Sequence, residues 1–306
     1  MFLIGENIHI ISSKVKKAIA EKDVKFFQDL AMKQVEAGAQ ALDLNIGPQK
    51  KAGPEIMDWL VGTVQEVADV PLSLDTTNLA AIEAGLKRAR QQAIINSTSA
   101  APERLEQVPP LAAEYGAKVI ALTMGQGMIP VKADERVGIA LEKLIPRALE
   151  VGIDIQDLII DPLVLTVSGC QEYCPECIEA VRTLKFAWDP PPPISVGLSN
   201  VSNAVPRKMR PLINRVYMVM LMAAGLDMAI ADPLDADLME TIRIVEERDD
   251  SMAIGALYLK LYDTTAAMEE LDPSDVDFDD PQQTDIWKTV QVLLNKVIYT
   301  DSYLRI

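Results

Sequence analysis

Eight short apolar segments recur along the chain, and each one ends in or beside a polar side chain. They span residues 2–6, 41–45, 71–76, 93–96, 119–123, 158–161, 195–200 and 228–232. Apolar runs of this length suit strands that are buried on both faces. Stretches with helical spacing separate them, which forces neighbouring strands to pair in parallel with right-handed crossovers. We therefore predict an α/β fold, and eight such units favour a closed (β/α)8 barrel over an open sheet.

Local signals place the intervening helices. Asp23 is a suitable N-cap for a helix over residues 24–36, and Gly38 supplies a left-handed stop after it. Pro54 suits the first turn of a second helix. The same spacing predicts further helices at residues 78–89, 102–115, 134–150, 174–186, 206–224 and 235–247.

The length of the chain fits one barrel with an addition near its end. The chain has 306 residues, somewhat more than the roughly 250 of a typical barrel. We expect residues 1–306 to form a single domain. Residues 269–285 hold eight acidic side chains and no Lys or Arg. We interpret the block at about 248–285 as an acidic insertion, and residues 286–299 as a return to helix.

Charge and cysteine content limit the partners and the compartment. The net charge is −16, from 29 Lys plus Arg and 45 Asp plus Glu, which disfavours binding to nucleic acid or to anionic membranes. The first segment contains Glu6 and lacks a basic start, unlike a signal peptide, and no segment resembles a membrane-spanning helix. Three cysteines argue against a disulfide framework. We expect a cytoplasmic protein.

The polar residues at the strand ends are the candidate site. Strand ends meet at one rim of a parallel barrel, where barrel enzymes keep their chemistry. Asp75, Asn96 and Asp161 follow the third, fourth and sixth strands and could line one slot for a flat ligand rich in donors and acceptors. Each could instead only cap the helix that follows it. Other polar residues at strand ends are Glu6, Asp43, Asn45, Ser199 and Asn200.

Two other chemistries receive less support. His9 is the only histidine and no GxSxG elbow is present, so neither a nucleophilic hydrolase nor a histidine-rich metal site is predicted. His9 could face the barrel mouth just past the first strand, but we interpret it as structural. Cys170, Cys174 and Cys177 share the C-x3-C-x2-C spacing of radical enzymes that hold an iron–sulfur cluster. Here the triad follows the sixth strand instead of an early one. Free cysteines are the default interpretation, and no metal site is predicted.

Nine segments together resemble the pterin-binding corrinoid methyltransferases, including those that serve corrinoid/iron–sulfur proteins and demethylation systems. They are IGEN (4–7), ALDLNIGP (41–48), LSLDTTN (72–78), EAGLK (83–87), INSTSA (95–100), LIIDPLVL (158–165), VGLSNVSN (196–203), RPLINR (210–215) and AGLDMAIAD (224–232). The likeness covers about residues 1–247. LLNKVIYTDSYL (293–304) also resembles the C-terminal helix of the family.

The resemblance implies a barrel like that of dihydropteroate synthase, assembled as a homodimer. It implies transfer of a methyl group between tetrahydrofolate, or 5-methyltetrahydrofolate, and a corrinoid (cobalamin) carried by a partner protein. Asp75, Asn96 and Asp161 would hold the pterin, and Asn200 would hydrogen-bond N5, the nitrogen that carries the methyl group. The supporting residues would be Glu6, Asp43, Asn45, Ser199 and Asn203.

The chain departs from the family in three places: after Gly5-Glu6, in the cysteine-bearing stretch 168–177, and at the block 248–285. These departures could alter which corrinoid protein docks. None of them removes a proposed pterin-binding residue. Two alternatives stay open. One is a pterin-binding protein without turnover, and the other is the radical enzyme with a cluster at Cys170, Cys174 and Cys177.

Overall fold

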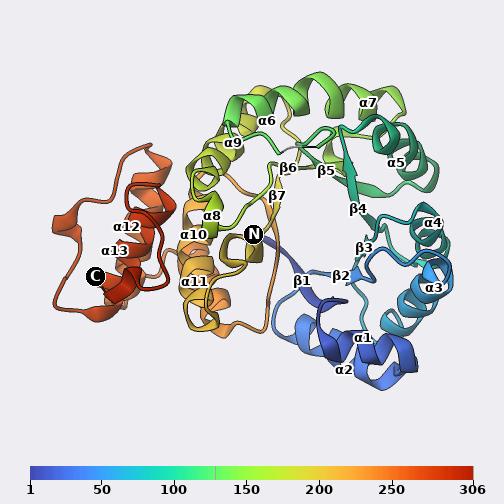
Figure 1. Ribbon diagram of the computed structural model, residues 1–306, viewed down its shortest axis with the longest axis horizontal. Helices are drawn as coiled ribbons and strands as arrows, with labels where there is room; N and C mark the ends of the chain where they lie inside the picture. Colours follow the sequence, from blue (N-terminus) through green and yellow to red (C-terminus); the bar gives the residue numbers. More distant parts are fainter. Residues whose placement is uncertain (128, 306) are drawn as a thin grey trace.

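A computed structural model describes residues 1–127 and 129–305 and confirms the (β/α)8 barrel (Figure 1). All neighbouring strands are parallel, in the order β6-β5-β4-β3-β2-β1-β8-β7. The strands are β1 (Phe2–His9), β2 (Ala41–Asn45), β3 (Leu72–Asp75), β4 (Ile94–Ser99), β5 (Lys118–Leu122), β6 (Leu158–Asp161), β7 (Ser195–Gly197) and β8 (Met228–Ala231).

The barrel closes between β6 and the residue before β7. Ile160 pairs in parallel with Ile194, and the Ile160 amide donates to the Pro193 carbonyl at 2.8 Å. A cluster of strand side chains, separate from the larger core under the helices, fills the interior as expected for a packed barrel. Its buried members are Ile4, Ala41, Ile94, Ile120, Ile159 and Met228.

Helices surround the strands largely where the sequence predicts them. Asp23 caps α2, accepting from the Phe26 amide at 3.0 Å, and Gly38 takes the left-handed conformation with φ 106°. The helices are α1 (Ser13–Glu21), α2 (Val24–Glu36), α3 (Gly53–Val64), α4 (Leu79–Arg88), α5 (Pro102–Tyr115), α6 (Ala133–Ile139), α7 (Ile145–Glu150), α8 (Val167–Cys170), α9 (Tyr173–Ala187), α10 (Arg210–Ala223), α11 (Ala236–Glu247), α12 (Ala253–Ala266) and α13 (Pro281–Leu293).

Three local expectations were wrong. The first strand extends to His9, because a register shift between Gly5 and Ile8 lets it continue along β2. Helix α1 was not expected. The seventh strand ends at Gly197 instead of residue 200, and residues Leu198–Ser202 form a 3-10 turn, η3, in which the Asn203 amide donates to the Asn200 carbonyl at 3.1 Å.

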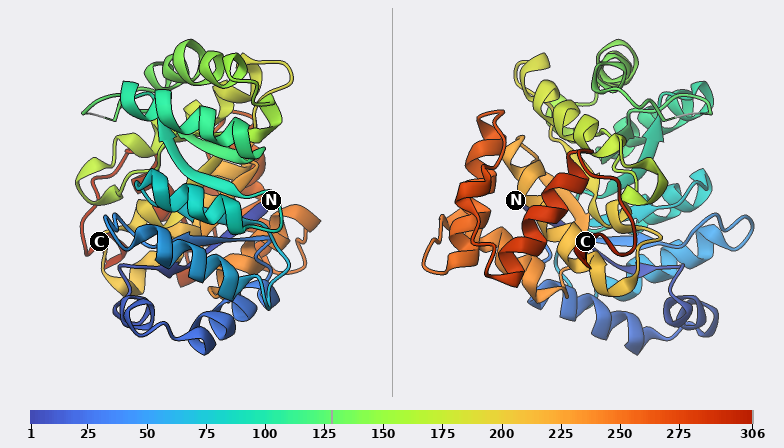
Figure 2. Two further views of the ribbon diagram at one scale, coloured as in Figure 1. Left: turned by 90° about the vertical axis from the view of Figure 1, so that its right-hand side faces the viewer. Right: turned by 60° about the vertical axis from the view of Figure 1, so that its left-hand side comes forward.

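The C-terminal region forms an extra layer on one side of the barrel. Helices α12 and α13 pack outside α10 and α11 (Figures 1 and 2). The prediction of a C-terminal helix at 293–304 is wrong. The predicted helix at 286–299 is confirmed only as far as Leu293. Helix α13 ends at Leu293, and Asn295 takes φ 58°, which turns the amides of Lys296 and Val297 back to the Gln291 carbonyl. That residues 248–285 are an insertion stays a prediction.

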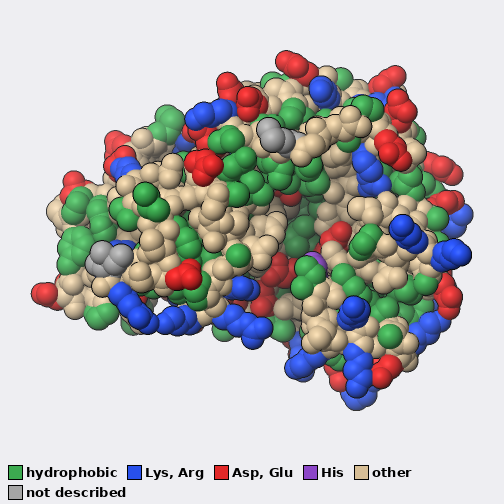
Figure 3. All heavy atoms as spheres, viewed as in Figure 1, with side chains coloured by type: hydrophobic (Ala, Val, Ile, Leu, Met, Phe, Trp, Pro, Cys, Tyr) green, Lys and Arg blue, Asp and Glu red, His purple; other side chains and the backbone are tan. Residues whose placement is uncertain are grey.

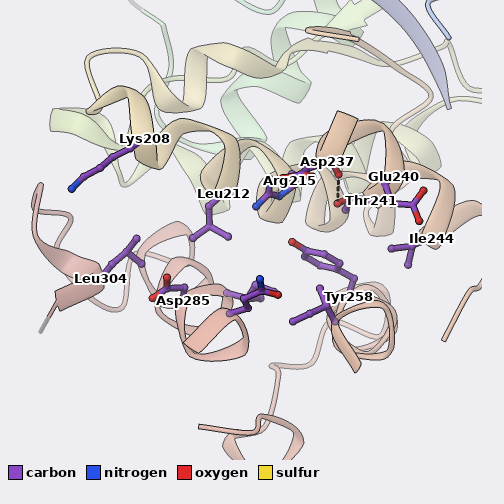
Figure 4. A pocket seen from close by; sticks show the side chains of 13 residues that line it. Lys208, Leu212, Arg215, Asp237, Glu240, Thr241, Ile244, Tyr258, Asp285 and Leu304 are labelled. Carbon is purple, nitrogen blue, oxygen red and sulfur yellow. Dashed lines mark hydrogen bonds and ion pairs between the residues drawn. The ribbon is translucent and has the colours of Figure 1, made fainter. Parts of the chain in front are cut away.

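The seam between the barrel and this layer contains a cleft of about 390 Å³ (Figure 4). Arg215 of α10 donates to the Asp237 carboxylate of α11 at 2.7 Å, and Tyr258 of α12 reaches toward them. These charged groups already pair with one another, and the cleft lies among outer helices.

In the described part of the chain, none of the helices has the length and apolar character needed to cross a membrane.

Candidate active site at the barrel mouth

A cavity of about 260 Å³ opens at the carboxyl ends of the strands. Figure 3 shows acidic side chains and the single histidine in the hollow on this face. Seven of the nine predicted site residues line it, whereas Asn45 and Asn203 do not. The lining residues are Glu6, His9, Asp43, Asp75, Asn96, Ser97, Leu122, Asp161, Leu163, Gly197, Ser199, Asn200 and Ile230.

Hydrogen bonds fix polar side chains of β2, β3 and β4. The Ser73 hydroxyl and the Asn96 amide nitrogen both donate to Oδ1 of Asp43, at 2.6 Å and 3.1 Å. The amide nitrogen of Asn45 donates to Oδ2 of Asp75. Asn45 therefore supports Asp75 from outside the cavity lining, and the orientation of the Asn96 amide is set by Asp43.

Asp43 and Asp75 share a buried environment that favours protonation. Burial and the neighbouring Asp75 charge raise the pKa of Asp43 well above its usual range, although the bonds from Ser73 and Asn96 oppose this. Burial also raises the pKa of Asp75, against the effect of the Asn45 bond. Of the two, Asp43 is the carboxyl that its surroundings shift more strongly toward the protonated form.

Asp161 ends β6 as a buried carboxyl. Its Oδ1 accepts from the Leu163 amide at 2.7 Å. Burial raises its pKa to about 7, and the Leu163 bond and the charge of Arg136 act in the opposite direction. Leu163 takes φ 70°, a left-handed conformation that is costly for a residue with a Cβ.

Glu6 lines the cavity from β1. Its Oε1 accepts from the Ser199 hydroxyl at 2.6 Å. Burial raises the pKa of Glu6 to about 7; the Ser199 bond lowers it, and the charge of Asp232 raises it further. Asp232, which ends the eighth predicted strand, accepts from the Asn7 amide nitrogen at 2.8 Å.

Asn200 lies at the rim, exposed, on the 3-10 turn after β7. Its amide nitrogen lies against Gly197, where an added Cβ would approach it to 3.1 Å. Asn203 is exposed outside the cavity lining, and its Oδ1 accepts from the Ala204 amide at 3.0 Å. The turn thus directs one of its two asparagines to the cavity.

His9 lies at the barrel mouth, the less favoured of the two placements considered from the sequence. It lines the cavity, and its Nδ1 accepts from the Ile11 amide at 3.1 Å, which leaves the proton of the neutral ring on Nε2. Burial lowers its pKa, and the Asp75 charge opposes this. Because of the register shift in β1, simple alternation along the strand does not decide which way His9 points. The other lining residues not predicted are Ser97, Leu122, Leu163, Gly197 and Ile230.

The cysteines do not form a ligand set. Cys174 and Cys177 are buried in the core along α9, whereas Cys170 is half-buried. Burial raises the pKa of Cys177 to about 11 and raises that of Cys174 further, which disfavours the thiolates that iron requires. Over residues 1–127 and 129–305, no group of three or more His, Cys, Asp or Glu side chains could hold a metal ion.

Carboxylates and amides converge at the mouth of this (β/α)8 barrel. The arrangement is typical of the class of barrels that bind a polar ligand at the strand ends. Residues 11–232 match the family model of pterin binding enzymes. The match covers more than half of the chain, so the chain belongs to the pterin-binding enzyme family.

Curated relatives are methyltransferases and methionine synthases. The chain is 29% identical over 248 residues to the methylcorrinoid:tetrahydrofolate methyltransferase of Eubacterium limosum, covering 79% of this chain and 89% of the relative. It is 30% identical over 258 residues to the methionine synthase of Mycobacterium leprae, covering 81% of this chain and 21% of the relative. The chain thus spans about a fifth of that methionine synthase.

Solved structures of dihydropteroate synthases share the fold. A Yersinia pestis synthase with a pterin–sulfa conjugate superposes with a TM-score of 0.57 at 17% identity, covering 81% of this chain and 94% of the other. A second synthase, with a product, gives a TM-score of 0.58 at 18% identity, covering 80% and 94%. At these identities the likeness concerns the barrel alone.

Proposed function

We propose that this chain is a methyltransferase that moves a methyl group between N5 of tetrahydrofolate and the cobalt of a corrinoid protein. One observation carries the proposal. Asp75, Asn96 and Asp161 meet in a single mouth cavity, with the neutral amide of Asn200 at its rim. The family match and the methylcorrinoid:tetrahydrofolate methyltransferase among the relatives support it.

The three inner residues offer what the edge of a pterin ring needs. Carboxylate oxygens of Asp75 and Asp161 accept from ring N–H and amino groups. The amide nitrogen of Asn96 already donates to Asp43, so its oxygen would be the group offered to the ring. Asp43 and Asn45 would hold Asn96 and Asp75 in place. Glu6 and Ser199, which bond to each other, would support the wall that carries Asn200. Asn203, outside the lining, would act at most through the turn.

Asn200 would act at the nitrogen whose bond changes. A methyl group on N5 is transferable only when N5 gains positive character, because a tertiary amine is a poor leaving group. A neutral amide can accept from a protonated N5 or donate to a free one without titrating itself. The corrinoid, when bound with its protein, supplies the cobalt that accepts or donates the methyl group. The chain contributes positioning and charge placement.

The exposure of Asn200 suits this arrangement. The rim is where a second large substrate has access, whereas Asp43 and Asp161 are buried below it. The proposal includes a corrinoid protein as partner, a homodimeric assembly and a cytoplasmic location.

A spectroscopic assay tests the proposal. The protein is mixed anaerobically with tetrahydrofolate and methylcob(III)alamin, free or on candidate carrier proteins. Growth of the cob(I)alamin absorbance is expected. Folate binding without any such absorbance, on every carrier, would favour a pterin-binding protein without turnover. Absence of both binding and turnover would overturn the proposal.

A further inference from the structure

Arg136 of α6 is a fully buried charge whose hydrogen bonds, among the described residues, go to backbone carbonyls. Nε donates to the Pro130 carbonyl at 3.0 Å, and Nη2 donates to that of Val131 at 3.2 Å. Nη1 donates to the carbonyls of Pro162 and Leu163, at 2.9 Å and 3.1 Å. One guanidinium therefore ties the loop after β5 to the loop after β6.

Packing alone does not account for this residue. Burying an ionised side chain is unfavourable unless its donors are satisfied, and a neutral residue would fill the same space without that cost. Five fixed donors on a planar group are what an arginine adds. The Tyr173 ring, whose centroid lies 5.5 Å from the guanidinium carbon, holds the plane in place.

The two carbonyls that Nη1 binds belong to the residues directly after Asp161. Leu163 takes its left-handed φ of 70° there, a conformation that is unfavourable for a residue with a Cβ. The same residue uses its amide to hold Oδ1 of Asp161 at 2.7 Å. The contacts thus run without a break from Arg136 to Leu163 and on to the carboxylate in the mouth.

We propose that Arg136 is a positioning residue for the pterin site: it holds the Pro162–Leu163 loop so that the Leu163 amide orients the Asp161 carboxylate toward the ligand. The inference rests on the proposed function, because it takes a pterin as the ligand of Asp161. Arg136 itself is absent from the cavity lining and acts through its neighbours.

Electrostatics agree with the geometry. The groups that face Asp161 are Arg136 from α6 and the thiol of Cys177 from α9. The positive charge lowers the pKa of Asp161, against burial, which raises it to about 7. The arginine therefore also favours the ionised carboxylate that accepts from a pterin.

A double-mutant cycle with Asp161 tests the proposal through binding, without turnover. Arg136→Lys keeps the charge but loses the fork of donors, and we expect tetrahydrofolate binding to weaken about tenfold by calorimetry. In the Asp161→Asn background, Arg136→Lys should weaken tetrahydrofolate binding by less than about twofold, because the carboxylate through which Arg136 acts on the ligand is absent. Equal losses in both backgrounds would overturn the proposal.

Arg182→Lys is the matched control. Arg182 is another largely buried arginine, bonded to Glu179 and to the Thr265 carbonyl, and it lies outside the cavity lining. We expect its replacement to leave tetrahydrofolate affinity unchanged. A wild-type protein that binds no folate would overturn the proposed function itself, whereas normal binding by Arg136→Lys would overturn this inference alone.

The pH profile separates positioning from general destabilisation. In Arg136→Gln, the midpoint of the loss of folate binding on the acid side should move up by about one pH unit, because Asp161 loses its neighbouring charge. Arg136→Lys should keep the wild-type midpoint. If neither variant folds, Tyr173→Leu can be used, because it removes only the ring beside the guanidinium. It should weaken folate binding when Asp161 is present, but not when Asp161 is replaced by Asn. Additive effects would contradict the proposal.

Discussion

The Ser199 hydroxyl donates a 2.6 Å hydrogen bond to Oε1 of Glu6, joining the turn after β7 to β1. Ser199 directly precedes Asn200, so this bond connects the rim amide to the half-buried carboxyl of Glu6 on the first strand. The cavity wall that carries Asn200 is therefore held by a residue of the first strand, near the N-terminus.

Replacing Glu6 should change how stability depends on pH. Burial raises its pKa from 4.5 to about 7, so the folded chain holds this proton more tightly than the unfolded chain. The tighter proton binding stabilises the folded chain. This contribution to the free energy of unfolding is fully present below pH 4.5 and is lost as the pH rises through 7. Glu6→Gln stays neutral and should be more stable than wild type at pH 8, by up to about 3 kcal/mol, but not at pH 4.5.

Urea unfolding at the two pH values measures this difference. Glu114→Gln, an exposed glutamate on α5, serves as the control and should change the free energy of unfolding by less than about 0.5 kcal/mol. A Glu6→Gln variant with the same pH profile as wild type would show that Glu6 is ionised in the folded protein.

Asn200→Ala should reduce methyl transfer by about a hundredfold or more while folate binding survives in large part, because the amide acts where charge changes. Rates from cob(I)alamin absorbance and affinities from calorimetry separate the two effects. Asn203→Ala is the matched control on the same turn, with its side chain bonded to Ala204, and it should have a small effect. Wild-type rates in Asn200→Ala would remove this residue from the mechanism.

Gly197→Ala should impair transfer through Asn200. Its φ of −81° permits alanine, but the new methyl would lie 3.1 Å from the Asn200 amide nitrogen and displace it. We expect the turnover rate to fall about tenfold with folding preserved, since small misplacements at a reacting centre are costly. Gly138→Ala, where a Cβ would meet nothing within 4 Å, should leave the rate unchanged. Equal rates in both variants would argue against a fixed amide.

Asp75→Asn and Asp161→Asn should each weaken tetrahydrofolate binding by about tenfold to a hundredfold, because each removes a charged acceptor for ring N–H groups. Titration calorimetry measures the affinity. Asp58→Asn, an exposed aspartate on α3, provides the control. Unchanged affinity in both site variants would show that the pterin binds elsewhere.

Much of the barrel and most of its mouth follow from the sequence, because strand ends of a parallel barrel share one rim. Asp75 and Asp161 could be placed there from the strand order alone. For His9 the sequence left two placements open, because a register shift within β1 changes which side chains point inward. Arg136 could not be identified from the sequence, because its function depends on carbonyls from two loops that meet only in the folded chain.

The C-terminal region shows the opposite failure. Helical periodicity over residues 286–299, and the likeness of LLNKVIYTDSYL to the C-terminal helix of the family, predicted a longer helix. The left-handed turn at Asn295 instead ends α13 just after Leu293. A single residue with positive φ outweighs helical periodicity, because the amides that follow it turn back to earlier carbonyls. The cysteine spacing was equally uninformative, since Cys174 and Cys177 pack into the core.

A crystal structure of the protein with bound 5-methyltetrahydrofolate tests the central claim most directly. It should show the pterin ring in the mouth cavity, hydrogen-bonded to Asp75, Asn96 and Asp161, with the Asn200 amide within hydrogen-bond distance of N5. A ring bound at another surface, or Asn200 turned away from N5, would contradict the account.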